Sequence, residues 1–235
     1  METILAPHHD LSYEQRHISE FKDFDWSKAT KWDAVSFARA SGFKETGMSA
    51  NEVALLFDLL EAKKPKPIVE LGRNYGTSTR LFLQHVIRHG GYLESWDLKH
   101  WDGFLEIMDA NGYPFFCFYG NEYVDIKSGA PHSPKIRIKV AHSIKTAIPE
   151  DFKVDFLLID TEHAMENAVS EYLRWREYLN SGALIAFHDS TLLAVSRSIE
   201  IILEIEDKCR PGRIDKIHKN EREDGFGICV LEWKG

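Results

Sequence analysis

Hydrophobic residues along this chain recur with two periods, one typical of strands and one typical of helices. Nearly continuous apolar runs of strand length occur at Ile68–Leu71, Val154–Ile159 and Ala183–Phe187, and each is followed by apolar residues at helical spacing. Alternation of this kind predicts an α/β protein whose sheet is mostly parallel, with helices packed against it. The last two runs favour central strands that are covered on both faces.

Four amphipathic stretches predict helices. They extend from Ser49 to Pro65, from Thr77 to His89, from Ala168 to Leu179 and from Leu192 to just before Pro211. The first opens with the capping box Ser49-x-x-Glu52, and the second stops at Gly90-Gly91. We expect Asn180-Ser181-Gly182 to close the third helix.

The remaining strand-like segments differ in their exposure. Tyr92–Asp97 predicts a second strand of the parallel sheet. Lys135–Val140 alternates Ile and Val with Lys and Arg, which predicts an edge strand with one solvated face. Ile214–His218 and Phe226–Trp233 lie too close together for a crossover helix, so we expect an antiparallel hairpin at the end of the chain.

Residues 1–47 have a different character. They are polar with scattered large aromatic side chains and show no strand pattern. We expect a helical extension that packs on the domain or covers it as a lid, with residues 48–235 forming the main domain. The same aromatic side chains are equally compatible with covering a partner subunit, which leaves a homo-oligomer open.

The overall charge excludes two classes of partner. The formal net charge of −8 argues against nucleic acid or an anionic membrane, because both attract a basic surface.

The three widely spaced cysteines form neither a zinc pattern nor a disulfide framework, which favours a reducing, cytoplasmic environment. We find neither a signal peptide nor an apolar stretch long enough to span a bilayer.

The turn after the first strand, Glu70 to Ser78, carries the most specific motif. It reads Glu-x-Gly-x-x-x-Gly-x-Ser and leads directly into a helix, an arrangement that offers backbone N–H groups to a nucleotide-like ligand. A dinucleotide fingerprint needs a further glycine, and a carboxylate here would repel a diphosphate. The same carboxylate can pair with the ammonium of an amino-acid-bearing nucleoside. The alternative interpretation is an ordinary connection between a strand and a helix.

Asp97 ends the second strand and is the next candidate. Two carboxylate oxygens match the vicinal hydroxyls of a ribose, which favours a nucleoside-binding role. The alternative is a solvent-facing acid at the end of a strand.

The glycine turn resembles the first motif of the class I S-adenosylmethionine-dependent methyltransferases. The order of elements from Ser49 to the C-terminus, with its terminal antiparallel hairpin, is similar to their seven-stranded, Rossmann-like fold. The resemblance implies S-adenosylmethionine as the cofactor. The residues it places at the cofactor are Glu70, Gly72, Tyr75, Gly76, Ser78, Asp97, His142, Ser143 and Asp160. Of these, His142 and Ser143 lie where the family contacts adenine, although the usual acid is missing.

A second group of polar residues follows two buried strands. Asp160 and His163 follow the strand at 154–159, and His188 and Asp189 follow the strand at 183–187. Neighbouring parallel strands end at the same edge of a sheet, so these side chains are expected to meet near the glycine turn. Two carboxylates beside imidazole nitrogens are typical of a divalent-cation site, most simply Mg²⁺. The alternatives are a helix-capping acid and structural or solvated histidines.

This pair of motifs resembles the methyltransferase family that includes macrocin O-methyltransferase and the cephalosporin methoxylation protein, called family 24. The resemblance implies that Asp160, His188 and Asp189 hold the metal. It also implies that His163 is the general base that takes the proton from the acceptor hydroxyl. His188 stands where the family has a carboxylate, and imidazole favours softer ions than Mg²⁺.

The segment from His100 to Pro134 is longer than a tight α/β connection requires and is rich in aromatic residues. One interpretation is a lid that shields the substrate. The other is a strand or core plug around Phe115 to Tyr119 without a ligand role.

Together these features predict an S-adenosylmethionine-dependent O-methyltransferase, assisted by a metal, that acts on a hydroxyl of a small natural-product or sugar-like molecule. A relative that binds the donor without transferring its methyl group, or that serves as a partner subunit, is the main alternative. A nicotinamide-dependent oxidoreductase is disfavoured by the missing glycine. A metal-dependent hydrolase would use the second group without a donor pocket.

Overall fold

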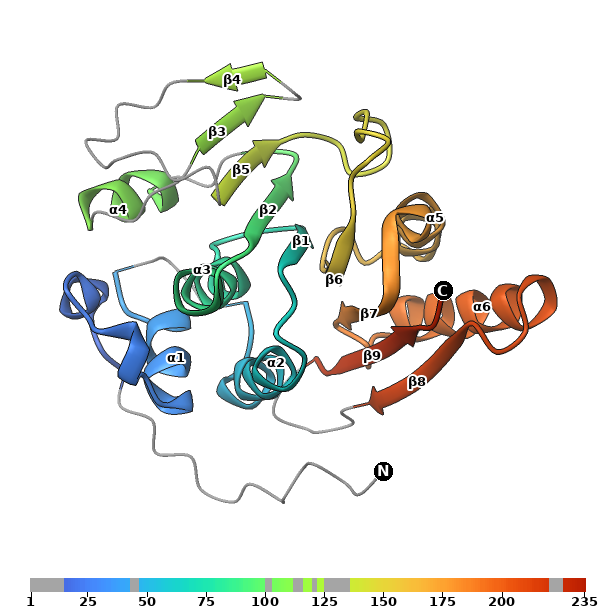
Figure 1. Cartoon of the computed structure of the whole chain (residues 1–235), viewed down its shortest axis with the longest axis horizontal. Helices are drawn as coiled ribbons and strands as arrows, with labels where there is room; N and C mark the ends of the chain where they lie inside the picture. Colours follow the sequence, from blue (N-terminus) through green and yellow to red (C-terminus); the bar gives the residue numbers. More distant parts are fainter. Residues whose placement is uncertain are drawn as a thin grey trace.

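The computed structural model describes residues 15–42, 47–99, 103–111, 116–119, 122–124, 136–219 and 226–235. Within these residues the strands form one nine-stranded sheet of order β4-β3-β5-β2-β1-β6-β7-β9-β8. The strands from β3 to β7 in this order are parallel to their neighbours, and β4, β8 and β9 pair antiparallel. Figure 1 shows the sheet running from β4 to β8.

The strands are β1 Pro67–Leu71, β2 Tyr92–Asp97, β3 Phe116–Tyr119, β4 Glu122–Val124, β5 Ile136–Val140, β6 Val154–Ile159, β7 Leu179–His188, β8 Ile214–Lys219 and β9 Ile228–Trp233. The α-helices are α1 Lys31–Ala38, α2 Ala50–Lys63, α3 Thr77–His89, α4 Phe104–Ala110, α5 Met165–Trp175 and α6 Leu193–Cys209. Three short 3-10 helices complete the described elements: η1 Ile18–Phe21, η2 Trp26–Lys28 and η3 Arg176–Tyr178.

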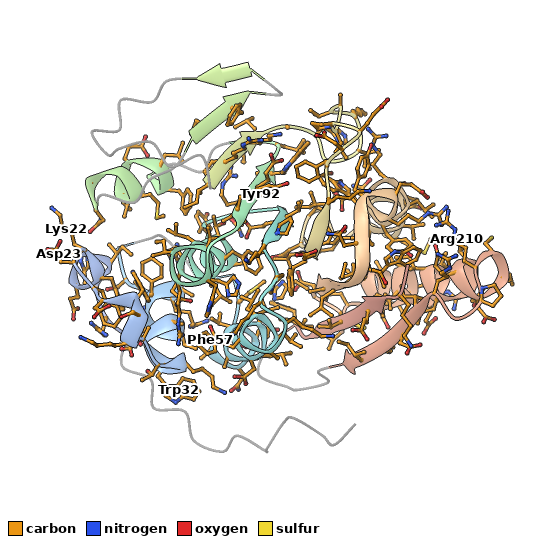
Figure 2. The ribbon with its side chains drawn as sticks, in the orientation of Figure 1. Lys22, Asp23, Trp32, Phe57, Tyr92 and Arg210 are labelled. Carbon is orange, nitrogen blue, oxygen red and sulfur yellow. The ribbon has the colours of Figure 1, made fainter. Side chains whose placement is uncertain are left out.

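Two hydrophobic layers cover the two faces of the sheet. Successive residues of one strand enter different layers, as when Ile68 packs with α2 and α3 while Val69 packs with α5 and α6. Figure 1 shows α1, α2 and α3 gathered on one side and α5 and α6 on the other. Figure 2 shows the side chains that fill these layers, with Phe57 of α2 labelled on the first side.

All seven predicted strands form and are neighbours in the sheet, which confirms the predicted fold class. The prediction that Lys135–Val140 forms an edge of the sheet is wrong. This strand, β5, lies between β2 and β3, and the hairpin of β3 and β4 extends the sheet beyond it. Of the basic side chains of β5, Lys139 is buried, whereas that of Arg137 is 43% exposed. Arg137 and Lys139 form ion pairs with the buried Glu94 of β2, at 3.0 and 3.1 Å. Their alternation therefore reflects pairing with a neighbouring strand.

The predicted end of the third helix also needs correction. Helix α5 ends at Trp175 and a 3-10 turn follows, so that Leu179 already pairs with Val154 of β6. The segment Asn180-Ser181-Gly182 lies within the exposed start of β7 and does not cap the helix. The other predicted helices agree closely with α2, α3 and α6.

The described part of the N-terminal extension packs as part of the same core. Phe21 and Phe37 are fully buried in the layer that also holds Phe82 of α3. Arg80 of α3, also buried, donates hydrogen bonds to the carbonyls of Phe37 and Ala38. Figure 2 places Lys22 and Asp23 at the outer edge of this layer. Residues 1–14 and 43–46 lie outside the described part, and a lid role for the extension remains a prediction.

Within the described residues, no helix combines the length and the apolar character needed to cross a membrane.

Candidate active site

A cavity of about 550 Å³ opens at the carboxyl ends of β1, β2, β5, β6 and β7. Its wall includes most of the residues that the sequence assigned to a cofactor. These are Gly72, Tyr75, Ser78, Asp97, His142, Ser143 and Asp160. The wall also includes His163, His188 and Asp189, so both predicted groups face one space. Glu70 and Gly76 are not part of this wall.

The two glycines of the turn are required by contacts within the protein. Gly72 and Gly76 have φ angles of +86° and +80°, which favour glycine. A Cβ on Gly72 would lie 1.8 Å from the carbonyl oxygen of Asp160, and one on Gly76 would lie 2.1 Å from the ring of Phe104. Close packing of β6 and α4 against the turn therefore explains both positions. Contact of Gly76 with the cofactor stays a prediction.

Glu70 has partners other than the expected ligand. Its carboxylate is fully buried and accepts hydrogen bonds from the hydroxyls of Ser78, Thr79 and Ser95. Burial raises the pKa of Glu70 to about 6, although the three hydroxyls and Arg73 favour the charged form. Glu70 thus holds Ser78, and Ser78 reaches the cavity, whereas contact of Glu70 with the donor ammonium stays a prediction.

The raised pKa predicts a specific pH dependence of stability. Between its ordinary value of 4.5 and about 6, the folded state binds more protons at Glu70 than the unfolded chain does. The free energy of unfolding should therefore fall as pH rises through this window, by about 2 kcal/mol. Glu70→Gln removes the titration, so the variant should lose this slope, as measured by urea denaturation from pH 4.5 to 7.5.

The comparison is made as a difference between the two proteins, because all other titrating groups are common to both and cancel. If the free energy of unfolding varied with pH in the same way in wild type and in Glu70→Gln, burial would not raise the pKa of Glu70.

Asp97 organises the glycine turn from the end of β2. Its Oδ2 accepts hydrogen bonds from the backbone N–H groups of Arg73 and Asn74, at 2.9 and 3.0 Å. The guanidinium of Arg73 is buried beneath the turn and donates to the carbonyl of Ser95 at 3.1 Å. Asp97 therefore holds the turn in place and lies on the wall of the cavity, which a purely solvent-facing acid would not do.

A buried acid that the sequence reasoning missed lies beside His142 and Ser143. Glu171 of α5 accepts hydrogen bonds from the hydroxyls of Ser143 and Thr161, and it reaches the cavity wall. Burial raises the pKa of Glu171. The sequence did contain a signal for its burial. Glu171 is a charged residue on the apolar stripe of the helix, between Ala168 and Trp175.

The second group forms a connected cluster of two acids and two histidines. The Nε2 atom of His163 lies 2.5 Å from Oδ2 of Asp189. The Nδ1 atom of His188 lies 3.1 Å from Asp160 and 3.2 Å from Asp189. His163 is about half exposed, whereas His188 and Asp189 are buried. Asp189 has a φ of +56°, an uncommon conformation that often marks functional positions.

Behind this cluster lies a third acid, Glu52, which the sequence marked only as a capping residue. Glu52 accepts hydrogen bonds from the backbone of Ser49 and Gly227 and lies 3.5 Å from Nε2 of His188. Burial alone would lower the pKa of His188, but the carboxylates of Asp160, Asp189 and Glu52 raise it well above its ordinary value. The opposite holds for Glu52: burial alone would raise its pKa, but His188 keeps it below the ordinary value.

The cluster has the donor atoms of a divalent-cation site in a different combination from the expected one. Asp160, His163 and Asp189 each offer a ligand atom, and these atoms lie within 4.8 Å of one another. His188 is outside this set; its Nε2, on the far side of the ring from Asp160 and Asp189, lies 3.5 Å from Glu52. Two carboxylates with one imidazole fit a hard or borderline divalent ion. The geometry therefore favours His163 over His188 as the nitrogen that can reach such an ion.

Comparisons with known proteins identify the family of this chain. A family model described as a methyltransferase domain, that of methyltransferase family 24, matches residues 69–190, just over half of the chain. This match includes both the glycine turn and the Asp–His cluster. A search of the curated proteins finds no significant match.

Several solved structures share the fold at low sequence identity. An O-methyltransferase from Bacillus cereus in complex with S-adenosylhomocysteine is 13% identical, with a TM-score of 0.55 over 92% of this chain and 96% of that one. The O-methyltransferase TomG from Streptomyces achromogenes, in complex with S-adenosylmethionine, is 11% identical, with a TM-score of 0.54 over 96% and 100%. CalS11, a TDP-rhamnose 3'-O-methyltransferase, is 15% identical, with a TM-score of 0.53 over 77% and 78%. With the family model matched across the site and the fold shared with solved O-methyltransferases, the chain belongs to methyltransferase family 24.

Proposed function

We propose that this chain transfers the methyl group of S-adenosylmethionine to a hydroxyl oxygen of a small acceptor of natural-product or sugar-like kind. The observation that carries the proposal is the pairing of His163 with Asp189 on the wall of the same cavity that the glycine turn lines. A base beside the donor site is what transfer to an alcohol requires, because a neutral hydroxyl is a poor nucleophile.

The donor is assigned to the half of the cavity between the glycine turn and the end of β5. Asp97 is proposed to accept hydrogen bonds from the ribose hydroxyls, since a carboxylate oxygen accepts more than one hydrogen bond. His142 and Ser143 are assigned to the adenine end, and Ser78 to the amino-acid end of the donor. This arrangement directs the sulfonium methyl towards the cluster at Asp160 and His163.

We assign His163 the role of general base, which takes the proton from the acceptor hydroxyl. Its partner Asp189 lies 2.5 Å away, orients the imidazole and stabilises the imidazolium that forms. The partial exposure of His163 leaves its ring accessible to an acceptor that enters from the cavity mouth. The methyl transfer itself is an in-line displacement, which depends on positioning and on the exclusion of water.

A divalent cation, proposed here as Mg²⁺, would be held by the carboxylates of Asp160 and Asp189, with water completing its ligands. Such an ion, when bound, lowers the pKa of a neighbouring hydroxyl. Nε2 of His163 pairs with Asp189, which leaves Nδ1 to accept the proton, and an imidazole that bound the ion through Nε2 would be a weaker base. We therefore assign His163 the proton and leave it out of the ligand set.

The donor assignment is tested first, without an acceptor. S-adenosylhomocysteine at about 100 times its Kd is expected to stabilise the protein by about 2.7 kcal/mol, because it binds only the native state. For a chain of this length, the melting temperature should rise by roughly 5–10 °C. NAD at the same concentration serves as the control and should leave it unchanged. A shift with NAD and none with S-adenosylhomocysteine would contradict the donor assignment.

The transfer is then measured with methyl-labelled S-adenosylmethionine and a panel of phenolic, glycoside and sugar-nucleotide hydroxyls. The panel follows the acceptors named for similar structures, such as TDP-rhamnose for CalS11. Excess chelator should stop the transfer and Mg²⁺ should restore it. Unchanged turnover in chelator would remove the cation from the proposal, and donor binding without transfer to any hydroxyl would favour a non-methylating relative.

A further inference from the structure

A second cluster of metal-ligating side chains lies away from the cavity, between α2 and α3. It consists of Glu61 near the end of α2 and of His85 and His89 on α3. One possible ligand atom from each side chain lies within 4.8 Å of the others. The two histidines are four residues apart, so they share one face of the helix, and their ring centroids are 4.7 Å apart. Figure 1 shows α2 and α3 side by side on the same face of the sheet.

The cluster is separate from the active site. The cavity touches the first turn of α3, at Thr77 and Ser78, whereas His85 and His89 lie in its last two turns. At 1.5 Å per residue this is a separation of about 12–18 Å along the helix. None of the three side chains lines the cavity.

His85 has the hydrogen bonding of a metal ligand. It is 1% exposed, and its Nε2 lies 3.1 Å from the carbonyl oxygen of Pro65. A carbonyl oxygen can only accept, so Nε2 carries the proton and Nδ1 is left with a lone pair. Among the described residues, this buried Nδ1 has no hydrogen-bond partner. A buried polar atom without a partner is uncommon and calls for an explanation such as an ion.

The other two side chains supply an accessible second half of the site. Nε2 of His89 lies 2.7 Å from Oε1 of Glu61, and Arg88 contacts the same oxygen at 3.4 Å. The side chains of His89 and Glu61 are 17% and 26% exposed, so an ion can reach them and water can complete its ligands. Two ligands of a tetrahedral ion lie about 3.3 Å apart, so a small rotation of these surface side chains would admit it.

We propose that Glu61, His85 and His89 form a zinc site that joins α2 to α3. Two imidazoles and one carboxylate with one open position match the ligand set of Zn²⁺, and nitrogen ligands discriminate against Mg²⁺ and Ca²⁺. The hydrogen bond from His85 to Pro65 fixes the tautomer of the ligand, as carbonyl groups behind metal-bound histidines commonly do. The bound ion would link the ends of both helices and the segment that leads into β1. The competing explanation is a polar contact between helices that binds no ion.

The test uses the full-length protein, freed of metal by a chelator and then titrated with ZnCl₂. Bound zinc is measured by competition with a chromogenic chelator, and melting temperature is followed in parallel. Because the active-site cluster is also proposed to bind a divalent ion, the titration is done in an Asp160→Asn, Asp189→Asn background. This protein should retain one zinc equivalent and show a higher melting temperature with zinc, whereas MgCl₂ should have no such effect.

His89→Ala and Glu61→Gln are the test variants in that background, because both positions are partly exposed and neither should prevent folding. Loss of a partner behind a ligand already weakens metal binding 10–100-fold, so loss of a ligand should weaken zinc binding at least about 100-fold and abolish the thermal shift. Equal zinc binding by the background protein and both variants, or no zinc equivalent in the background protein, would overturn the proposal.

Discussion

Turnover of the His163→Ala variant is expected to fall by about 10²–10⁴-fold, the usual contribution of a general base. His163 contacts Asp189 at 2.5 Å, and Asp189 cannot replace it, because its carboxylate is buried beside His188. Donor binding should be unchanged, since the donor is assigned to the turn and to the end of β5. The measurements are methyl transfer to an acceptor identified in the screen and calorimetric titration with S-adenosylhomocysteine.

The control is chemical rescue. Added imidazole should restore part of the activity of His163→Ala and have no effect on wild type, because a small base can occupy the space left by a half-exposed ring. A structural role for His163 would not respond to imidazole. A variant that keeps full turnover would show that another group takes the proton.

Replacement of Gly72 by alanine should lower the free energy of unfolding by about 2–5 kcal/mol, the largest effect on stability expected here. The φ of +86° costs an L-residue about 1–2 kcal/mol, and the new Cβ would lie 1.8 Å from the carbonyl oxygen of Asp160. Neither backbone can move easily, because Gly72 donates to Trp96 and Asp160 donates to Leu71, both at 2.8 Å. The forced displacement adds a further cost typical of overpacking, about 1–3 kcal/mol. Urea denaturation of the two proteins measures the difference.

Gly182→Ala is the matched control. Gly182 has nearly the same φ, +84°, but a Cβ there would have no heavy atom of the described residues within 4 Å. Its substitution should therefore lower the free energy of unfolding only through the unfavourable φ angle, by about 1–2 kcal/mol. Equal losses at the two positions would show that the contact between β1 and β6 can relax.

Local sequence signals predicted the backbone of this protein well. The capping box at Ser49 and Glu52 marks the start of α2, and the helix predicted from Thr77 to His89 is α3 to the residue. Strand β6 likewise has the predicted bounds. These signals work because capping and hydrophobic period depend on residues within one or two turns of each other.

The prediction of an edge strand failed because the position of β5 depends on neighbours from distant parts of the chain. Arg137 and Lys139 have the pattern of a solvated edge, yet both form ion pairs with the buried Glu94, which is in register with Arg137 on the neighbouring strand. Only strand pairing brings residues 43 positions apart together, and no local period reports it. The hairpin of β3 and β4, which displaces β5 from the edge, lies in a segment where the sequence left lid and strand equally open.

The candidate site shows the same division. The sequence by itself determined which polar residues follow which strands, and in a parallel sheet all those strand ends meet at one edge, so Asp97, Asp160 and Asp189 had to converge. Only the tertiary structure decided what each side chain contacts there. It turned Glu70 away from the cavity towards the hydroxyls of α3 and β2, and it placed Glu52, from a distant helix, behind His188. The direction of a side chain and its partners depend on packing between elements far apart in the chain, which a pattern along the chain does not contain.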